Sequence, residues 1–275
     1  MKTVKRLLAV IFLIMAFGGV SAQKNSQEMT VPLSEPGKPV TLECGLMHGS
    51  LNVTGYDGKE VIVTVFVDST KEDADDDDDN RGGMKRINFP VGMDVRVEEH
   101  DNTVRINTGM ERNIAALKIM VPHNTGRINV STTMGGEITV TNVSGKVEIS
   151  NLNGNITATG ISGSVVANGL NGSIVVSMKS LDPSAAMAFS SMNGKIDLTL
   201  PADTKANLKL KSENGKVYSD FDVAVDKGTP KVETKNEDHF HEIKLDDWVY
   251  GKINGGGPEI MIQNQYGSIF IRKAK

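Results

Sequence analysis

The chain has 275 residues, enough to bury a sizeable core, with 34 acidic and 30 basic side chains. Removal of residues 1–22 as a secretory signal leaves 27 basic against 34 acidic residues, a net charge of −7. This acidity argues against nucleic acid or an anionic membrane surface as the partner. The one cysteine, Cys44, allows no intramolecular disulfide, and we expect it to be a small buried apolar side chain.

The first 22 residues have the three parts of a signal peptide. Lys2, Lys5 and Arg6 form the charged start, residues 7–17 the apolar segment, and residues 20–22 a small-residue cleavage site. The apolar segment is too short for a stable membrane anchor. We therefore expect an exported protein that is periplasmic, cell-surface or secreted, with no membrane span in the mature chain.

An aspartate-rich segment interrupts the N-terminal part of the chain at residues 68–86. Five consecutive aspartates at 75–79 repel one another and predict an exposed, disordered loop. Asp75, Asp77 and Asp79 are weak candidates for Ca²⁺ ligands, because Ca²⁺ prefers several oxygens. The segment lacks the glycine and the glutamate of an EF-hand loop, which favours loose counter-ion attraction over a specific site.

Four glycines in the middle of the chain recur every nine residues: Gly145, Gly154, Gly163 and Gly172. The positions two before, two after and four after each glycine are apolar or small. These positions hold Val143, Val147, Ile149, Leu152, Ile156, Ala158, Ile161, Val165, Ala167, Leu170, Ile174 and Val176. A short fixed period is typical of repeat architectures, in which stacked neighbours build the core together.

Each repeat predicts a short strand followed by a tight turn. Residues 146–150 alternate polar and apolar, as in a half-buried strand, and the following Asn-Gly or Ser-Gly tolerates positive φ. An antiparallel meander of hairpins also fits this spacing. The alternation of Asn-Gly with Ser-Gly favours instead a flattened coil with two corners per turn.

The Asn-Gly corners mark coils of 18, 22 and 21 residues. We expect like corners to stack, their glycines to have positive φ and their asparagines to form a ladder. These corners are Asn153-Gly154, Asn171-Gly172, Asn193-Gly194 and Asn214-Gly215. Ile156 should then lie against Ile174, and Val147 against Val165. The predicted fold class is all-β, a parallel β-helix or β-solenoid with coils of about 18–22 residues, capped at both ends.

The C-terminal part holds two further candidate sites. His239 and His241 alternate on an extended segment and present a possible zinc or copper pair, although solvated surface histidines are favoured. Trp248 and Tyr250 lie on one face of a predicted strand, as in a sugar-stacking platform. Because aromatic residues are few elsewhere, packing of a C-terminal cap is the favoured explanation of the two rings.

The predicted organisation is a signal peptide at 1–22 and a single β-solenoid domain at 23–275. Within the domain, residues 23–120 form N-terminal coils and a cap, 121–225 the regular repeats, and 226–275 a loop with a C-terminal coil and cap.

Four segments resemble the DUF4097 family of β-strand repeat proteins, whose members are called "putative adhesins". The segments are 49–63, 192–201, 213–221 and 253–260, the last reading Ile-Asn-Gly-Gly-Gly-Pro-Glu-Ile. The resemblance implies a β-helix-like fold and an exported, adhesin-type protein, and it brings no catalytic motif.

The outward positions of the repeat suggest no chemistry. Three residues after the glycine stand Thr157, Val175, Asp197 and Tyr218 on one side of the coil, and Glu148 and Val166 on the other. No column of acids or bases forms, which predicts a non-enzymatic scaffold without cofactor. Its partner would be a macromolecule, protein or glycan, at the cell envelope. A polysaccharide-binding or polysaccharide-degrading β-helix protein is the alternative, and an envelope-stress signalling partner is a third reading.

Overall fold

The structure is a computed structural model that describes residues 26–67, 95–109, 114–226, 232–237, 240–245 and 248–275, the fourth and fifth of these by backbone alone. The signal segment, the aspartate-rich loop with Asp75, Asp77 and Asp79, and His239 lie outside the described residues. Those described form strands and turns and include no helix, which confirms the all-β class.

Twenty strands form one hydrogen-bonded sheet, which contains two ladders of parallel strands. Ladder A consists, in spatial order, of β6 (Thr103–Asn107), β2 (Val40–Leu46), β8 (Thr125–Thr132), β10 (Ser144–Asn153), the second part of β11 (Ile156–Asn171), β13 (Met187–Asn193), β21 (Glu259–Tyr266) and β15 (Ala206–Ser212). Ladder B consists of β7 (Ile114–Pro122), β3 (Ser50–Tyr56), β9 (Ile138–Thr141), the first part of β11, β12 (Ile174–Leu181), β14 (Ile196–Leu200), β22 (Ile269–Lys273) and β16 (Val217–Ser219).

The core lies between the two ladders and consists of columns of aliphatic side chains. One column of ladder B is fully buried over seven strands: Leu117, Leu51, Ile138, Ile156, Ile174, Ile196 and Ile269. The period-2 alternation places these side chains inward and their neighbours outward. Ile156 pairs with Ile174 and Val147 with Val165, both in parallel register, as predicted.

The prediction of a core position is wrong for two of the apolar residues. Leu152 and Leu170, each two residues before an Asn-Gly corner, are exposed by 42% and 36%. Their counterparts before Ser-Gly corners, Val143 and Ile161, are buried. The two corner types therefore turn the chain differently, and only the Ser-Gly type points this position into the core.

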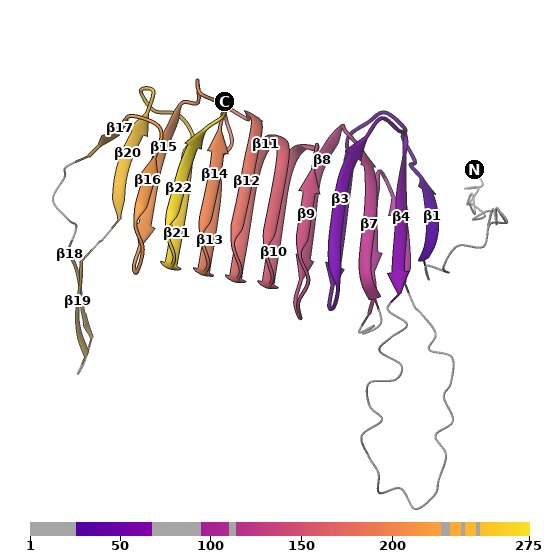
Figure 1. Ribbon diagram of the computed structural model, residues 1–275, viewed down its shortest axis with the longest axis horizontal. Coiled ribbons are helices and arrows are strands. Elements are labelled where there is room, and N and C mark those ends of the chain that lie inside the picture. Colours follow the sequence, from indigo (N-terminus) through magenta and orange to yellow (C-terminus); the bar gives the residue numbers. More distant parts are fainter. Residues whose placement is uncertain (1–25, 68–94, 110–113, 227–231, 238–239, 246–247) are drawn as a thin grey trace, which may run out of the picture.

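Spatial order departs from chain order at the C-terminal end (Figure 1). The yellow strands β21 and β22 lie between β13/β14 on one side and β15/β16 on the other. The expectation that successive coils stack directly, with a C-terminal coil and cap outside them, is therefore wrong for residues 259–273. Hydrogen bonds are available on both edges of every parallel strand, so a later segment can enter the stack as well as a consecutive one.

The N-terminal end is threaded in a similar way. β2 and β3 are flanked by β6 and β7 outside and by β8 and β9 inside. Within the region 23–120 predicted as N-terminal coils and a cap, residues 40–56 therefore belong to an interior layer and not to the cap.

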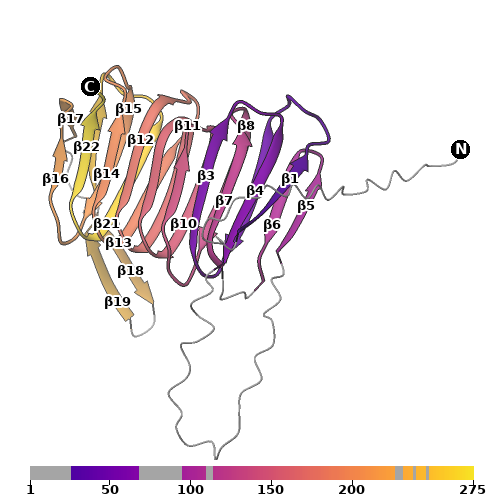
Figure 2. The ribbon, with the colours of Figure 1, turned by 45° about the vertical axis from the view of Figure 1, so that its right-hand side comes forward.

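Antiparallel strands cover most of the two ends. β4 (Glu60–Val67) pairs with β7 and β1 (Ser26–Pro32) with β4, while β5 (Arg96–His100) pairs with β6. At the other end β20 (Val249–Ile253) pairs with β15, and β17 (Val223–Val225) with β20. The strands β18 (Val232–Glu237) and β19 (Phe240–Leu245) form a separate hairpin, which projects from the stack in Figure 2.

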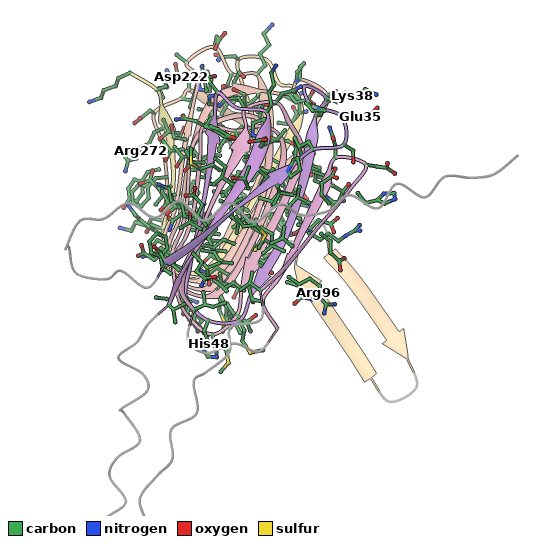
Figure 3. All side chains as sticks on the ribbon, turned by 90° about the vertical axis from the view of Figure 1, so that its right-hand side faces the viewer. Glu35, Lys38, His48, Arg96, Asp222 and Arg272 are labelled. Atoms are coloured by element: carbon green, nitrogen blue, oxygen red, sulfur yellow. The ribbon has the colours of Figure 1, made fainter. Side chains whose placement is uncertain are left out.

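The outer faces of the two ladders point to opposite flanks of the molecule. Figure 3, along the stack, shows Arg272 of ladder B on one flank and Arg96, on the strand next to ladder A, on the other. Within the described part of the chain, no helix is long and apolar enough to cross a membrane.

Candidate functional site

The predicted corner glycines occupy positions that other residues cannot take without strain. Positive φ is found at Gly145 (93°), Gly154 (146°), Gly163 (128°), Gly172 (149°) and Gly194 (117°). A Cβ at Gly172 would lie well inside 3.0 Å of the carbonyl oxygen of Gly154. Glycine is therefore required twice, by its own backbone angle and by the close approach of the next layer.

The asparagine ladder is confirmed for three of its four members. Asn171 donates from Nδ2 to Oδ1 of Asn153, and Asn193 donates to Oδ1 of Asn171, both at 2.8 Å. At the end of the ladder, Asn153 donates from Nδ2 to the carbonyl oxygen of Thr133 at 3.2 Å. The side chains thus link consecutive layers at one edge of the stack.

The fourth member, Asn214, does not join this ladder. The inserted β21 places Tyr266 next to Asn193, and Asn214 donates instead to the carbonyl oxygen of Gln265 at 3.3 Å. Gly215 does not have positive φ, and its hypothetical Cβ faces Gly267 rather than Gly194. Both expectations for this corner are wrong for the same reason, the inserted layer.

Sequence reasoning missed a second polar column, which lies inside the same corner. Asn151, Ser191 and Asn264, each three residues before a corner glycine, are buried. Asn151 and Asn264 donate from Nδ2 to the carbonyl oxygens of Gly136 and Gly194, at 3.0 and 2.8 Å. The column satisfies corner carbonyls that would otherwise be buried without a partner. Its sequence signal is a polar residue at a fixed distance before Asn-Gly or Tyr-Gly.

Trp248 and Tyr250 lie on the outer side of ladder A, at its C-terminal end. Nζ of Lys209 is 4.7 Å from the centre of the Trp248 ring, and Lys209 is the cross-strand neighbour of Tyr250. Trp248 is half-buried and Tyr250 is 41% exposed. One aromatic face therefore already has a cation on it, and the more accessible ring is Tyr250.

No metal site emerges where the structure describes the chain. Among those residues, no group of three or more His, Cys, Asp or Glu is placed to hold a metal ion. His241 belongs to β19, of which only the backbone is described. Cys44 is buried in ladder A, as predicted, and burial raises the pKa of its thiol to about 12. A thiol held neutral in this way is unreactive at physiological pH.

A cluster of aromatic and charged side chains occupies the outer face of ladder B at its C-terminal end. We call it the aromatic–cation patch, and it comprises Lys195, Asp197, Lys216, Tyr218, Phe270 and Arg272. The three strands β14, β22 and β16 place Asp197, Phe270 and Tyr218 in one column. The rings of Phe270 and Tyr218 are stacked, with centroids 5.2 Å apart and planes at 11°.

A carboxylate fixes the cations of this patch. Asp197, whose side chain is 10% exposed, accepts Arg272 Nε at 2.7 Å, Arg272 Nη2 at 3.3 Å and Lys195 Nζ at 3.1 Å. Burial acts to raise the pKa of Asp197, but the hydrogen bonds from Arg272 and Lys195 outweigh it and hold that pKa below its usual value. The bond to Asp197 raises the pKa of Arg272. Asp197 and Arg272 are therefore both charged over the physiological range.

The sequence did not predict the patch because the spatial order of the strands differs from their order along the chain. The outward positions Asp197 and Tyr218 were recognised as members of one column, but Phe270 stands between them only when β22 is inserted. Asp197 was assigned to an outward position and is nearly buried instead. The signal was present in the third position after Gly267, which has the same spacing as the other corners.

A different surface runs along the outer edge of ladder A. Leu152, Leu170 and Met192 are exposed on consecutive strands at corresponding positions. Leu152 and Leu170 border a shallow cavity of ≈ 390 Å³ together with Ser150 and Asn168. We call these three residues the apolar stripe.

Comparison with known proteins gives structural likeness alone. No family model and no curated protein matches the chain. A "putative cell adhesion protein" from Clostridium sporogenes matches with a TM-score of 0.47 and 10% identity, over 92% of this chain and 100% of its own. A "putative adhesin" from Bacteroides fragilis matches with a TM-score of 0.41 and 10% identity, over 93% and 100%. Another from Parabacteroides merdae has a TM-score of 0.27 and 7% identity, over 91% and 96%.

Proposed function

We propose that this chain is an exported, non-enzymatic β-solenoid that binds a macromolecular partner at the cell envelope, in the manner of an adhesin. The solenoid reading is supported by the two parallel ladders and the columns of buried aliphatic residues between them. The proposal of an adhesin is supported by the sequence resemblance described above and by the regular outward columns of ladder B.

The observation that carries the proposal is the regularity of the outer face of ladder B. Thr139, Thr157 and Val175 form one outward column, and Thr141, Thr159 and Ser177 form the next. Strands in such a ladder are about 4.8 Å apart, so the part of the face formed by β9, β11 and β12, before the column reaches Asp197, presents small hydroxyl and β-branched side chains at a constant interval. A surface of this kind fits an extended or polymeric partner better than a small molecule, which needs a concave pocket.

A second candidate function, binding of a polysaccharide, is favoured by the exposed rings at the C-terminal end of both faces. Tyr218 and Tyr250 are exposed by 49% and 41%. A sugar ring has an apolar face that packs on an aromatic ring, with hydroxyl groups around it for the neighbouring polar side chains.

The experiment uses the mature chain, residues 23–275, and measures binding to intact bacterial and host cells and turnover of polysaccharides. We expect saturable binding that is lost in Thr139→Lys/Thr157→Lys, on the face of ladder B. The matched variant on ladder A, Ser150→Lys/Asn168→Lys, should retain it. Equal loss in both variants, or release of sugar fragments from a polysaccharide, would contradict the proposal.

A further inference from the structure

We propose that the aromatic–cation patch binds a glycan that carries carboxylate groups, with one sugar ring on the open face of Tyr218 and the carboxylate of another residue of the glycan beside the cations. The inference rests on the proposed function and names a ligand class and a site for it. It concerns the outer face of ladder B, whereas the sequence pointed to Trp248 and Tyr250 on ladder A.

The first argument is an open aromatic face at the end of a column. The Phe270 ring is stacked on Tyr218 and has the guanidinium carbon of Arg272 at 5.1 Å and Nζ of Lys195 at 6.0 Å from its centre. Tyr218 is the last member of the column, because in the described part of ladder B no strand follows β16. Half of its surface is exposed. The C–H face of a sugar ring can therefore continue the stack where the protein ends.

The second argument is a surplus of hydrogen-bond donors. Arg272 has five N–H groups and uses two nitrogens on Asp197, and Lys195 uses one contact on the same carboxylate. Lys216, exposed two residues before Tyr218, forms no ion pair with any described residue. Such a surface suits a ligand rich in acceptors, and a planar carboxylate matches the remaining guanidinium edge.

The third argument is preorganisation. Asp197 holds both cations in place before any ligand arrives, and the strands beneath are rigidly packed against Ile196, Ile269 and Ile271. Little side-chain entropy is then lost on binding. A rigid charged group next to an exposed ring is the arrangement expected of a recognition site rather than of a merely solvated surface.

The size and charge of the patch favour a glycan over a nucleic acid. Nucleotides also stack on aromatic rings and present anionic groups. The patch, however, spans three strands, about 10 Å across the ladder, and the mature chain around it is acidic. One or two uronate residues fit this area, whereas a long polyanion such as a nucleic-acid strand would extend beyond it and meet repulsion from the acidic surroundings.

The test measures binding of the mature chain to four soluble probes by isothermal titration, each cut to two or three residues so that it does not extend beyond the patch: oligogalacturonate, dextran, dextran sulfate and oligothymidine. We expect oligogalacturonate to bind best, with an affinity that falls as salt is raised. Tyr218→Ala should weaken this binding about tenfold through loss of the stacking surface. Lys216→Gln should weaken it about threefold and reduce the salt dependence.

The matched controls lie on the opposite face. Tyr250→Ala and Lys209→Gln alter the competing polysaccharide site on ladder A and should leave binding unchanged if the ligand occupies the aromatic–cation patch alone; melting temperatures verify that all variants fold. No binding of oligogalacturonate, equal binding of dextran, or tighter binding of dextran sulfate or oligothymidine would overturn the inference. An equal loss in Tyr250→Ala would also overturn it. Persisting cell binding that depends on Thr139 and Thr157 would then show that the proposed function stands without this site.

Discussion

At the scale of single residues, glycine and asparagine have two separate roles at the corners. The glycine allows positive φ and lets the next layer approach, while the asparagine side chain links the layers. Ser173, directly after Gly172, donates its backbone N–H to Asn155 and accepts from Ile156 at its carbonyl, and its hydroxyl oxygen accepts from the backbone N–H of Lys195. The same corner therefore offers a test of backbone geometry against polarity.

We expect Gly172→Val to lower the melting temperature far more than Ser173→Val. A Cβ at positive φ costs about 1–2 kcal/mol, and the clash with the carbonyl of Gly154 adds to this. Thermal unfolding of both purified variants, followed by circular dichroism, measures the difference. If the two melting temperatures agree, the corner does not need glycine.

Asp197 makes stability depend on pH in a defined window. Because its pKa is lower in the folded protein than in the unfolded chain, its ion pairs contribute stability above about pH 4, the unfolded value. That contribution disappears as pH falls through the lower folded pKa. We expect the wild type to be more stable than Asp197→Asn to urea at pH 7, with the difference shrinking below about pH 4. A difference that stays constant down to pH 2 would show that the carboxylate charge is irrelevant.

At the scale of elements, each strand depends on its neighbours for its buried face. Ile174 is fully buried between Ile156 and Ile196 in one column of ladder B. A strand of this length cannot bury its own apolar side, so stability arises from the stacking of layers.

Ile174→Asp should therefore prevent cooperative folding of the central layers, because burying a large aliphatic side chain contributes about 1.5–3 kcal/mol and a buried unpaired carboxylate adds a larger penalty. Thr159→Asp, on the exposed outer face of the same ladder, is the control and should fold. Urea unfolding monitored by circular dichroism distinguishes the two. A cooperative transition in Ile174→Asp would mean that the column tolerates a charge.

The sequence predicts the local features of the fold, its turns and strand register, but not the order in which the layers stack. The nine-residue period, the corner glycines other than Gly215 and the register of Ile156 with Ile174 follow from alternation and turn chemistry, and the structure confirms them. The order of layers does not follow, because columns of Ile, Val and Leu accept any neighbour of similar shape. Phe270 was therefore not assigned to the column of Asp197 and Tyr218, and the aromatic–cation patch was missed with it.

At the scale of the whole molecule, the C-terminal strands β21 and β22 act as an internal layer. Ile260, Ile262, Ile269 and Ile271 are buried, and both strands pair on both sides. Their removal separates β13/β14 from β15/β16.

A chain that ends at residue 258 should therefore lose cooperative unfolding, because four parallel pairings disappear and the core opens. Deletion of residues 23–30, at the opposite end, removes most of the edge strand β1 and should lower the melting temperature only slightly. Calorimetry of both truncated chains makes the comparison. Similar, small effects of the two deletions would contradict the internal position of β21 and β22.

The spatial order of the strands also determines where additional repeat units can be inserted into such a protein. In residues 144–181 the order along the chain and the order in space coincide, so a duplicated unit there meets the same neighbours as its template. A duplicate of residues 259–273 would have no such place, because the layers on either side come from earlier, non-adjacent parts of the chain. Changes of length during evolution should accordingly be concentrated in the middle, while the two ends remain constant in number of layers.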